Sequence, residues 1–356
     1  MTNQLQSLFE KRIVSVEESL PEGVSSINNR IALGENGIYF LRVGFADGSL
    51  LDCVRKVKSP RIIRNGIRLI SGKSARFTLS MTLHKKILGY NKSCTREISL
   101  YKHLDRSLRR HMPVFYGSFF DRRSGLYSLI LRRYFPVSDG THGFSAAKRA
   151  LNTLLDFHIF YYNREDQAKK LGLNICSPKD YRRSRGFIRL LFRADEEENR
   201  RYFSEQKLNK IERFIDKIHL YAAKFSHHRS FSHNDFSHRN IFFTENKTLI
   251  YDFELAAFQN PEHDLIELLI YEAENLSRRE ILELIEYHKS RLSPHAPPLR
   301  GMDGKQYKEL LLFNAYEFIV IRLSLLRIAG KVLGEGFVDS LLSGADKLTE
   351  ILEEDL

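Results

Sequence analysis

With 356 residues, 42% of them hydrophobic, the chain is long enough to bury a sizeable core and is expected to be globular. The formal net charge of +12 favours anionic partners such as nucleotides, phosphorylated metabolites, anionic glycans, a membrane surface or nucleic acid, and charge alone does not choose among them. The three cysteines are widely spaced and show no Cys/His ligand pattern, which argues against a disulfide scaffold or zinc site and fits a reducing cytoplasm.

The sequence predicts neither a signal peptide nor a membrane-spanning helix. The start, MTNQLQSLFEKRIV, has no apolar core of signal-peptide length and predicts a short amphipathic helix. The most hydrophobic tract, 309–330, is interrupted by Asn314, Glu317 and Arg322, so it predicts a buried helix rather than a membrane span. We therefore expect a soluble, cytoplasmic protein.

The first third of the chain predicts strands. Three strands are expected at 24–33, 37–45 and 49–57, because the separators GENG and ADG have the composition of hairpin turns. Residues 64–71 and 75–83 are expected to form a second hairpin, joined by Gly-Lys.

The next tract begins with a helix. Ile98, Tyr101 and Leu104 fall on one face of a predicted helix over 95–110. Two further strands follow at 114–121 and 126–135, around the turn RRSG.

The remainder of the chain predicts helices. Apolar residues recur at helical spacing in several segments, namely 146–162, 205–225, 262–276 and the long helices after 305. A sheet-rich front and a helix-rich back predict an α+β fold of two lobes, with a small antiparallel sheet in the first and mainly helices in the second. We place the lobes at 1–133 and 144–356, with a hinge at 134–143, and expect the site in the cleft between them.

The segment FSHNDFSHRNIFF, residues 231–243, carries an unusual density of polar side chains between phenylalanines. Each polar group buried there must find a partner, so the density suggests a site. The turn-like TENK between NIFF and TLIYDF predicts a β-hairpin over 240–253, which places Asn240 opposite Tyr251 or Asp252. Opposed residues lie roughly 5 Å apart, so an amide oxygen and a carboxylate there could share one hard cation, naturally Mg²⁺.

Asp235 lies five residues before Asn240, in a loop that enters the first strand of this hairpin. A carboxylate in that position could accept the proton of an attacking hydroxyl. Phosphoryl transfer requires this combination of metal ligands and a base that orients the nucleophile.

HNDFSHRN, followed twelve residues after Asn240 by DFE, resembles the catalytic segments of the aminoglycoside phosphotransferase and choline/ethanolamine kinase superfamily, whose fold is similar to that of protein kinases. The HND and YDFE spellings look closest to the choline/ethanolamine branch, and the resemblance spans residues 231–268. It implies that Asp235 is the catalytic base and that Asn240 and Asp252 hold magnesium. It also implies that His233 and Asp264 brace the catalytic loop. Glu254 stays open between a second metal contact and a plain surface acid, and a simply exposed side chain is the alternative interpretation of His238.

Kinase-like folds also pair a strand lysine with a helical glutamate that together grip the inner phosphates of ATP. Alternation in LLDCVRKVKS puts Lys56 beside Val54 on one face, which makes it the first choice, with Arg55 and Lys85 as alternatives. Glu97 in TREISLYKHL is the best-placed glutamate.

Gly34 and Gly37 supply a short glycine-bearing turn in which backbone N–H groups could approach a phosphate. The GxGxxG pattern is missing, and a simple hairpin turn explains the two glycines almost as well.

The sequence gives weaker signals for the substrate that accepts the phosphoryl group. Sites for cations such as choline or aminoglycosides are usually lined by carboxylates or aromatic faces, and this chain is strongly basic and has no tryptophan. Basic clusters at 106–111, 131–134 and 180–193 could bind a phosphorylated sugar, an anionic glycan or a membrane surface, or could simply be solvated. No recognition motif for nucleic acid accompanies them, so nucleic acid is disfavoured.

The sequence thus predicts an ATP- and Mg²⁺-dependent kinase that acts on a hydroxyl of a small molecule or glycan. A catalytically idle, nucleotide-binding regulator is the alternative of a different class. A choline/ethanolamine-type kinase or a protein kinase is a further one.

Overall fold

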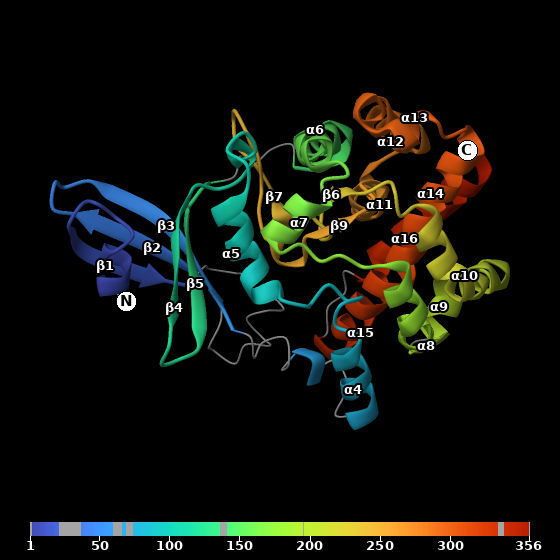
Figure 1. The fold of residues 1–356 in the computed structure, drawn as a ribbon, viewed down its shortest axis with the longest axis horizontal. Coiled ribbons are helices and arrows are strands. Elements are labelled where there is room, and N and C mark those ends of the chain that lie inside the picture. The colour runs from blue at the N-terminus through green and yellow to red at the C-terminus, as the bar shows by residue number, and fades with distance from the viewer. Residues whose placement is uncertain are drawn as a thin grey trace.

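The computed structural model of the protein describes residues 2–20, 37–59, 66–68, 74–135, 141–194, 196–333 and 338–355. The expected strand at 24–33 and Gly34 lie outside the described residues. A five-stranded antiparallel sheet forms the first lobe, in the order β1-β2-β3-β5-β4 (Figure 1). Its strands are β1 (Ile13–Ser19), β2 (Gly37–Phe45), β3 (Leu50–Lys58), β4 (Phe115–Asp121) and β5 (Leu126–Arg132).

Four of these strands were predicted from the sequence, whereas β1 was not. Among the described residues, strand β1 lies at the edge of the sheet and pairs with β2 alone, and of its seven residues only Ile13 is buried. An edge strand with one buried side chain leaves almost no alternation of apolar and polar residues to read. The short helix predicted at the N-terminus is α1 (Thr2–Gln6).

The hairpin expected over 64–83 is wrong, because residues Ala75–Leu83 form helix α4 and residues 66–68, the part of the expected first strand that the structure describes, are helical as well. Ser74 caps this helix by accepting a hydrogen bond from the backbone N–H of Phe77, which satisfies a donor that a strand would have paired. Leu79 and Leu83 are exposed and only Met81 is buried, so the alternating pattern of ARFTLSMTL does not reflect a packed strand face.

Helix α5 (Ser93–His103) lies between the sheet and the helical lobe (Figure 1). The helical lobe contains the other long helices predicted from the sequence. Its helices are α6 (Gly143–Tyr161), α7 (Glu165–Leu171), α8 (Pro178–Arg193), α9 (Glu196–Tyr202), α10 (Glu205–Lys224), α11 (Glu262–Tyr271), α12 (Arg278–Leu292), α13 (Pro297–Arg300), α14 (Gly304–Glu317), α15 (Ser324–Leu333) and α16 (Val338–Asp355). Short 3-10 turns are η1 (Arg109–His111), η2 (His238–Asn240), η3 (Phe253–Leu255), η4 (Ala273–Asn275) and η5 (Ser293–His295).

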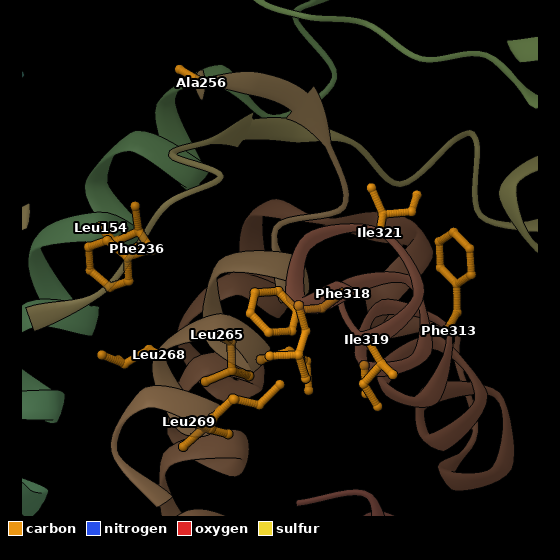
Figure 2. Close-up of a cluster of buried hydrophobic side chains, with 14 of the residues drawn as sticks. Leu154, Phe236, Ala256, Leu265, Leu268, Leu269, Phe313, Phe318, Ile319 and Ile321 are labelled. Atoms are coloured by element: carbon orange, nitrogen blue, oxygen red, sulfur yellow. The ribbon is translucent and has the colours of Figure 1, made fainter. Parts of the chain in front are cut away.

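The hydrophobic tract 309–330 belongs to one continuous buried helix, as expected. Between α14 and α15 it passes through a π-helical segment, η6 (Phe318–Leu323), in which five of six residues are buried. Phe318 of η6 lies beside Leu265 of α11 in the main core (Figure 2). In the part of the chain that the structure describes, no helix is both long and apolar enough to cross a membrane.

The two faces of the sheet pack against different hydrophobic cores. Cys53 of β3 and Ile130 of β5 face a small core that includes Leu5 of α1. Leu129 and Leu131 of β5 face the opposite way and join the large core of the helical lobe. The second face of β3 is therefore the one directed at the rest of the molecule, and the α+β, two-lobed fold predicted from the sequence is confirmed.

Candidate active site

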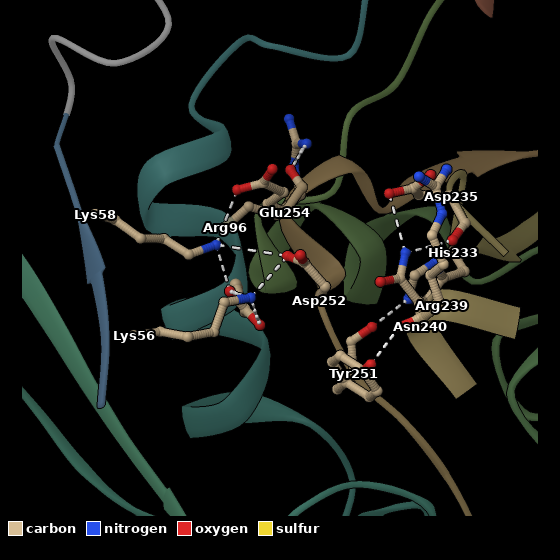
Figure 3. Close-up of polar contacts among 11 residues, drawn as sticks. Lys56, Lys58, Arg96, His233, Asp235, Arg239, Asn240, Tyr251, Asp252 and Glu254 are labelled. Carbon is tan, nitrogen blue, oxygen red and sulfur yellow. Dashed lines mark hydrogen bonds and ion pairs between the residues drawn. The ribbon is translucent and has the colours of Figure 1, made fainter. Parts of the chain in front are cut away.

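Lys56 is directed from the sheet toward the helical lobe. It pairs with Leu129 in the β3–β5 register, on the face that joins the large core. Its ammonium nitrogen lies 3.0 Å from each carboxylate oxygen of Glu97 on α5 and 2.8 Å from Oδ1 of Asp252 (Figure 3). One lysine thus joins the sheet, helix α5 and the C-terminal end of the 240–253 hairpin.

A second lysine, two residues later on the same face of β3, shares this cluster. Lys58 forms an ion pair with Glu97 and another with Glu254, at 3.0 Å, and lies 3.8 Å from Asp252. Burial lowers the pKa of Lys58, but the charges of Glu254, Glu97 and Asp252 outweigh it and hold the pKa well above the usual value. Lys58 is therefore a charged member of the cluster that was not predicted.

The carboxylate of Asp252 is ionised. Burial raises its pKa, but the charges of Lys56 and Lys58 and the hydrogen bond from Lys56 hold it below the usual value. Asp252 also has a left-handed backbone, with φ of 66°, a conformation that Asp adopts more readily than most residues.

Arg96 fixes the position of helix α5 relative to the site. Its completely buried guanidinium donates hydrogen bonds to the backbone carbonyls of Gly89, Asn91, Gly172 and Glu254. Because Glu97 is the next residue, this clamp also fixes the carboxylate that Lys56 contacts. Sequence reasoning missed Arg96.

The loop that carries Asp235 is tied down by Asp264, at the start of α11. Its fully buried carboxylate accepts hydrogen bonds from the backbone N–H groups of His233, at 2.8 Å, and Asn234, at 2.9 Å, and from the Ser232 hydroxyl, at 2.8 Å. Nε2 of His158 lies 3.2 Å from the same carboxylate. Burial raises the pKa of Asp264, but the hydrogen bond and charge of His158 lower it to about 2.

His233 links the same loop to the second strand of the hairpin. Its Nε2 lies 2.9 Å from the backbone oxygen of Tyr251. Its ring packs against those of Phe236 and Phe253. These contacts are of the bracing kind that the resemblance implies for His233.

The hairpin predicted over 240–253 is present, and its register is the predicted one. Strands β7 (Ile241–Phe243) and β8 (Thr248–Ile250) pair Ile241 with Ile250. One residue further, the Tyr251 N–H donates to the backbone oxygen of Asn240, at 3.1 Å. Asn240 is thus opposite Tyr251, and Asp252 is the next residue along.

Asn240 and Asp252 have the donor chemistry that magnesium requires. The side-chain nitrogen of Asn240 donates to the Asp235 carboxylate, at 3.0 Å, and to the Asp235 backbone oxygen, at 2.8 Å. Its amide oxygen is therefore directed away from Asp235. In Figure 3 Asp252 lies between the two lysines and the Asn240–Asp235 pair. An amide oxygen and an ionised carboxylate oxygen are both ligands that Mg²⁺ accepts.

Asp235 has a second partner that was not predicted. The Nη2 group of Arg322, from the π-helical segment η6, donates to its Oδ1 at 2.7 Å. Both side chains remain partly exposed, Asp235 by 21% and Arg322 by 14%. The candidate base is thus reachable from solvent and lies beside a fixed positive charge.

Beneath Asp235, Glu267 of α11 is fully buried, and its Oε2 accepts a hydrogen bond from the Phe236 backbone N–H at 2.6 Å. Burial, together with the negative charge of Asp235, raises its pKa to about 7. The other charged or titratable groups that act on it are His263, Arg322 and Asp264.

We expect Glu267→Gln to flatten the dependence of stability on pH. The folded protein holds a proton on Glu267 that the unfolded chain releases near its ordinary pKa of 4.5, so stability falls as the pH rises from about 4.5 to 7. Gln keeps the acceptor for Phe236 and removes the titration. In urea unfolding, the free energy of unfolding of the variant should rise relative to that of wild type by up to about 3 kcal/mol between pH 5 and pH 8.

Exposed Glu245 provides the matched control, and Glu245→Gln should leave the pH dependence unchanged. Parallel pH profiles for wild type and Glu267→Gln would contradict the raised pKa.

The remaining predicted residues lie as follows. Arg55 points to the other face of β3, where it pairs with Glu18, and Lys85 is exposed. Gly37 is the first residue of β2 and is paired with Val57. Of the two open assignments, Glu254 contacts Lys58, and His238 is partly buried near His142 and Glu272 rather than simply exposed.

The sequence matches the phosphotransferase enzyme family (APH) over residues 79–299, more than half of the chain. A search of curated proteins found no match. Among solved structures, a choline kinase from Cryptosporidium parvum is 12% identical, with 95% of this chain and 89% of that chain covered and a TM-score of 0.53.

A macrolide 2'-phosphotransferase from Brachybacterium faecium is 12% identical, with 96% of each chain covered and a TM-score of 0.47. A GDP and kanamycin complex of an APH(2") protein is 17% identical, with 100% of this chain and 99% of that chain covered and a TM-score of 0.48. Of these three likenesses, the first exceeds a TM-score of 0.5 and shows a shared fold. The chain therefore belongs to the phosphotransferase enzyme family and has the two-lobed, protein-kinase-like fold that its sequence resembles.

Proposed function

We propose that the protein is an ATP-dependent kinase that transfers the γ-phosphoryl group to a hydroxyl of a small molecule or glycan. The observation that carries this proposal is the position of Lys56, whose ammonium group contacts both Glu97 of α5 and Asp252, two residues after strand β8. That contact joins the two lobes across the place where a nucleotide's phosphates would lie. The lobes are proposed to divide at residues 134–143.

The nucleotide side of the site consists of Lys56, Glu97 and the neighbouring Lys58. In the proposed complex Lys56 contacts the inner phosphates and Glu97 holds it in place. Gly37, at the start of β2, would let the backbone approach a phosphate. Lys58 adds a second positive charge to the same cluster, which favours a polyphosphate ligand.

Asn240 and Asp252 are proposed to hold Mg²⁺ through an amide oxygen and a carboxylate oxygen. When bound, the ion would neutralise charge on the phosphate oxygens. Lys56 now occupies one oxygen of Asp252, so in the complex it would shift toward the phosphates. The second oxygen of that carboxylate makes no hydrogen bond or ion pair with the described residues and would be available without this shift.

Asp235 is proposed to orient the acceptor hydroxyl and take its proton. The acceptor oxygen forms a bond to the γ-phosphorus as the bond from that phosphorus to the β,γ-bridging oxygen breaks, and ADP leaves. Asp264 holds the backbone N–H groups of His233 and Asn234, and the His233 ring contacts the Tyr251 backbone oxygen, so both would keep the loop that carries Asp235 in place.

The proposal is tested by incubating wild type and Lys56→Met with γ-labelled ATP and a panel of amino alcohols, sugars, nucleosides and glycans. Wild type should label a soluble acceptor, and Lys56→Met should reduce kcat/KM for ATP by about a hundredfold because it removes a charged phosphate contact. Lys58 still pairs with Glu97 in this variant, so folding should be retained. Lys11→Met, at an exposed lysine near the sheet, is the control and should behave as wild type.

The other outcomes separate the alternatives. Label found on protein alone would favour a protein kinase. Nucleotide binding without any transfer would favour a catalytically idle regulator.

A further inference from the structure

Arg322 is a charged residue in an otherwise apolar helical segment. The other five residues of η6 are buried and hydrophobic. π-Helical segments are rare and occur frequently at functional sites, because the extra residue in the turn redirects a side chain. Here the redirected side chain is a guanidinium that reaches Asp235 on the catalytic loop.

The hydrogen bonding of Arg322 differs from that of the structural arginines nearby. Arg96 donates to four backbone carbonyls, and Arg327, five residues after Arg322 on the same helix, donates to Asn199 and to the Phe192 carbonyl. Arg322 instead donates to a carboxylate, that of Asp235, which is itself partly exposed. The acceptor is what distinguishes Arg322: the two structural arginines bind backbone and amide oxygens, whereas Arg322 binds the candidate catalytic base.

The side chain of Arg322 is also accessible to solvent, whereas that of Arg96 is not. Its side chain is 14% exposed and that of its partner Asp235 is 21% exposed, whereas Arg96 is 1% exposed. A molecule that presents a hydroxyl to Asp235 would therefore also meet the guanidinium of Arg322.

The exposed groups around Asp235 are more positive than those expected around a bound cation. Arg239 adds a second guanidinium, which lies over the Tyr271 ring and donates to its hydroxyl at 3.1 Å. The carboxylates of Asp264, Glu267 and Glu272 lie next to the loop and are all buried, and the first two accept hydrogen bonds from its backbone. None of these three is offered to a substrate.

We propose that Arg322 selects an alcohol that also carries a phosphate or carboxylate group, binding that anionic group while the hydroxyl faces Asp235. This inference rests on the proposed function and narrows its acceptor class. An anionic group accepts charge-assisted hydrogen bonds from a guanidinium, often two at once. A cationic acceptor, such as an amino alcohol, would be repelled at the same place.

The test compares wild type, Arg322→Gln and Arg322→Lys with acceptors in matched pairs that differ by one charged group. Suitable sets are glycerol with glycerol 3-phosphate, glucose with glucose 6-phosphate, and choline as the cation. Wild type should prefer the phosphorylated member by roughly tenfold to a hundredfold in kcat/KM. Arg322→Gln should lose that preference and Arg322→Lys should keep part of it. The exposed Arg291→Gln is the control.

A binding measurement removes the dependence on turnover. Inorganic phosphate is titrated by calorimetry into protein saturated with the non-hydrolysable analogue AMP-PNP, so that the nucleotide site is filled. Wild type should bind phosphate at least about tenfold more tightly than Arg322→Gln.

The inference is overturned if neutral or cationic acceptors are preferred, if Arg322→Gln slows all acceptors equally, or if phosphate binds both proteins alike or neither. Equal slowing of all acceptors would show that Arg322 only positions Asp235. Failure of AMP-PNP to bind would count against the proposed function instead. The phosphate titration would then be repeated without nucleotide, and its dependence on Arg322 would still decide the inference.

Discussion

Asp235→Asn should abolish phosphoryl transfer, with kcat reduced by about a thousandfold or more, while the affinity for ATP stays within about twofold of wild type. General bases contribute on the order of 10² to 10⁴ to a rate, and an amide cannot take the proton of the acceptor hydroxyl. Nucleotide affinity should be retained because the proposed phosphate contacts are made by the Lys56, Glu97 and Asp252 cluster, which this substitution leaves intact. Initial rates and isothermal titration with ATP check the two halves of this prediction.

The loop should keep its shape in this variant. The Asn oxygen can still accept from Arg322, and the Asn240 side chain still donates to the backbone oxygen of residue 235. Ser237→Ala, two residues later, is the matched control, since the Ser237 hydroxyl is buried and makes no hydrogen bond within the described residues. Full activity in Asp235→Asn would show that Asp235 is only the ion-pair partner of Arg322.

Local sequence patterns were sufficient for the parts of the site that depend on local structure. The composition of TENK fixes a turn, and the turn fixes the register that brings Asn240 beside Tyr251 and Asp252. Alternation along β3 gives the face of Lys56, and the helical pattern of α5 gives Glu97. Each of these follows from neighbours within about ten residues.

Contacts between residues far apart in the sequence could not be predicted from local patterns in this way. Arg322 lies 87 residues after Asp235, and its role depends on where a π-helical turn places it. Its only sequence signal was a charge inside an apolar tract, which served to argue against a membrane span. Lys58 could have been found, because the alternation that selects Lys56 also selects the residue two positions later.

The misassigned helix α4 has a different cause. ARFTLSMTL alternates like a strand, yet this segment has a helix cap at Ser74 and exposes Leu79 and Leu83. Alternation predicts a strand only where one face is buried against a partner, and a single sequence does not show whether a partner exists.

Asp264→Asn should destabilise the protein by about 3 to 5 kcal/mol, the range typical of breaking a buried charged network. Both carboxylate oxygens of Asp264 accept hydrogen bonds, from the Ser232 hydroxyl and from the backbone N–H groups of His233 and Asn234. An amide offers one acceptor and turns an N–H₂ group toward donors on its other side, so at least one buried N–H loses its partner. Urea unfolding at pH 7 measures the loss.

Asp303→Asn is the matched control for this variant. Asp303 caps the start of α14 at the surface, where Asn is about as good a cap as Asp, so the change should be within a few tenths of a kcal/mol. The pKa of Asp264, lowered to about 2, predicts that its contribution persists down to about pH 4 and is lost as the pH falls toward 2. The folded fraction of Asp264→Asn should bind ATP but transfer poorly, because the released backbone lies next to Asp235 and not next to Lys56. Wild-type stability in Asp264→Asn would mean that the loop is held by other contacts, and the assignment of Asp264 as its brace would be wrong.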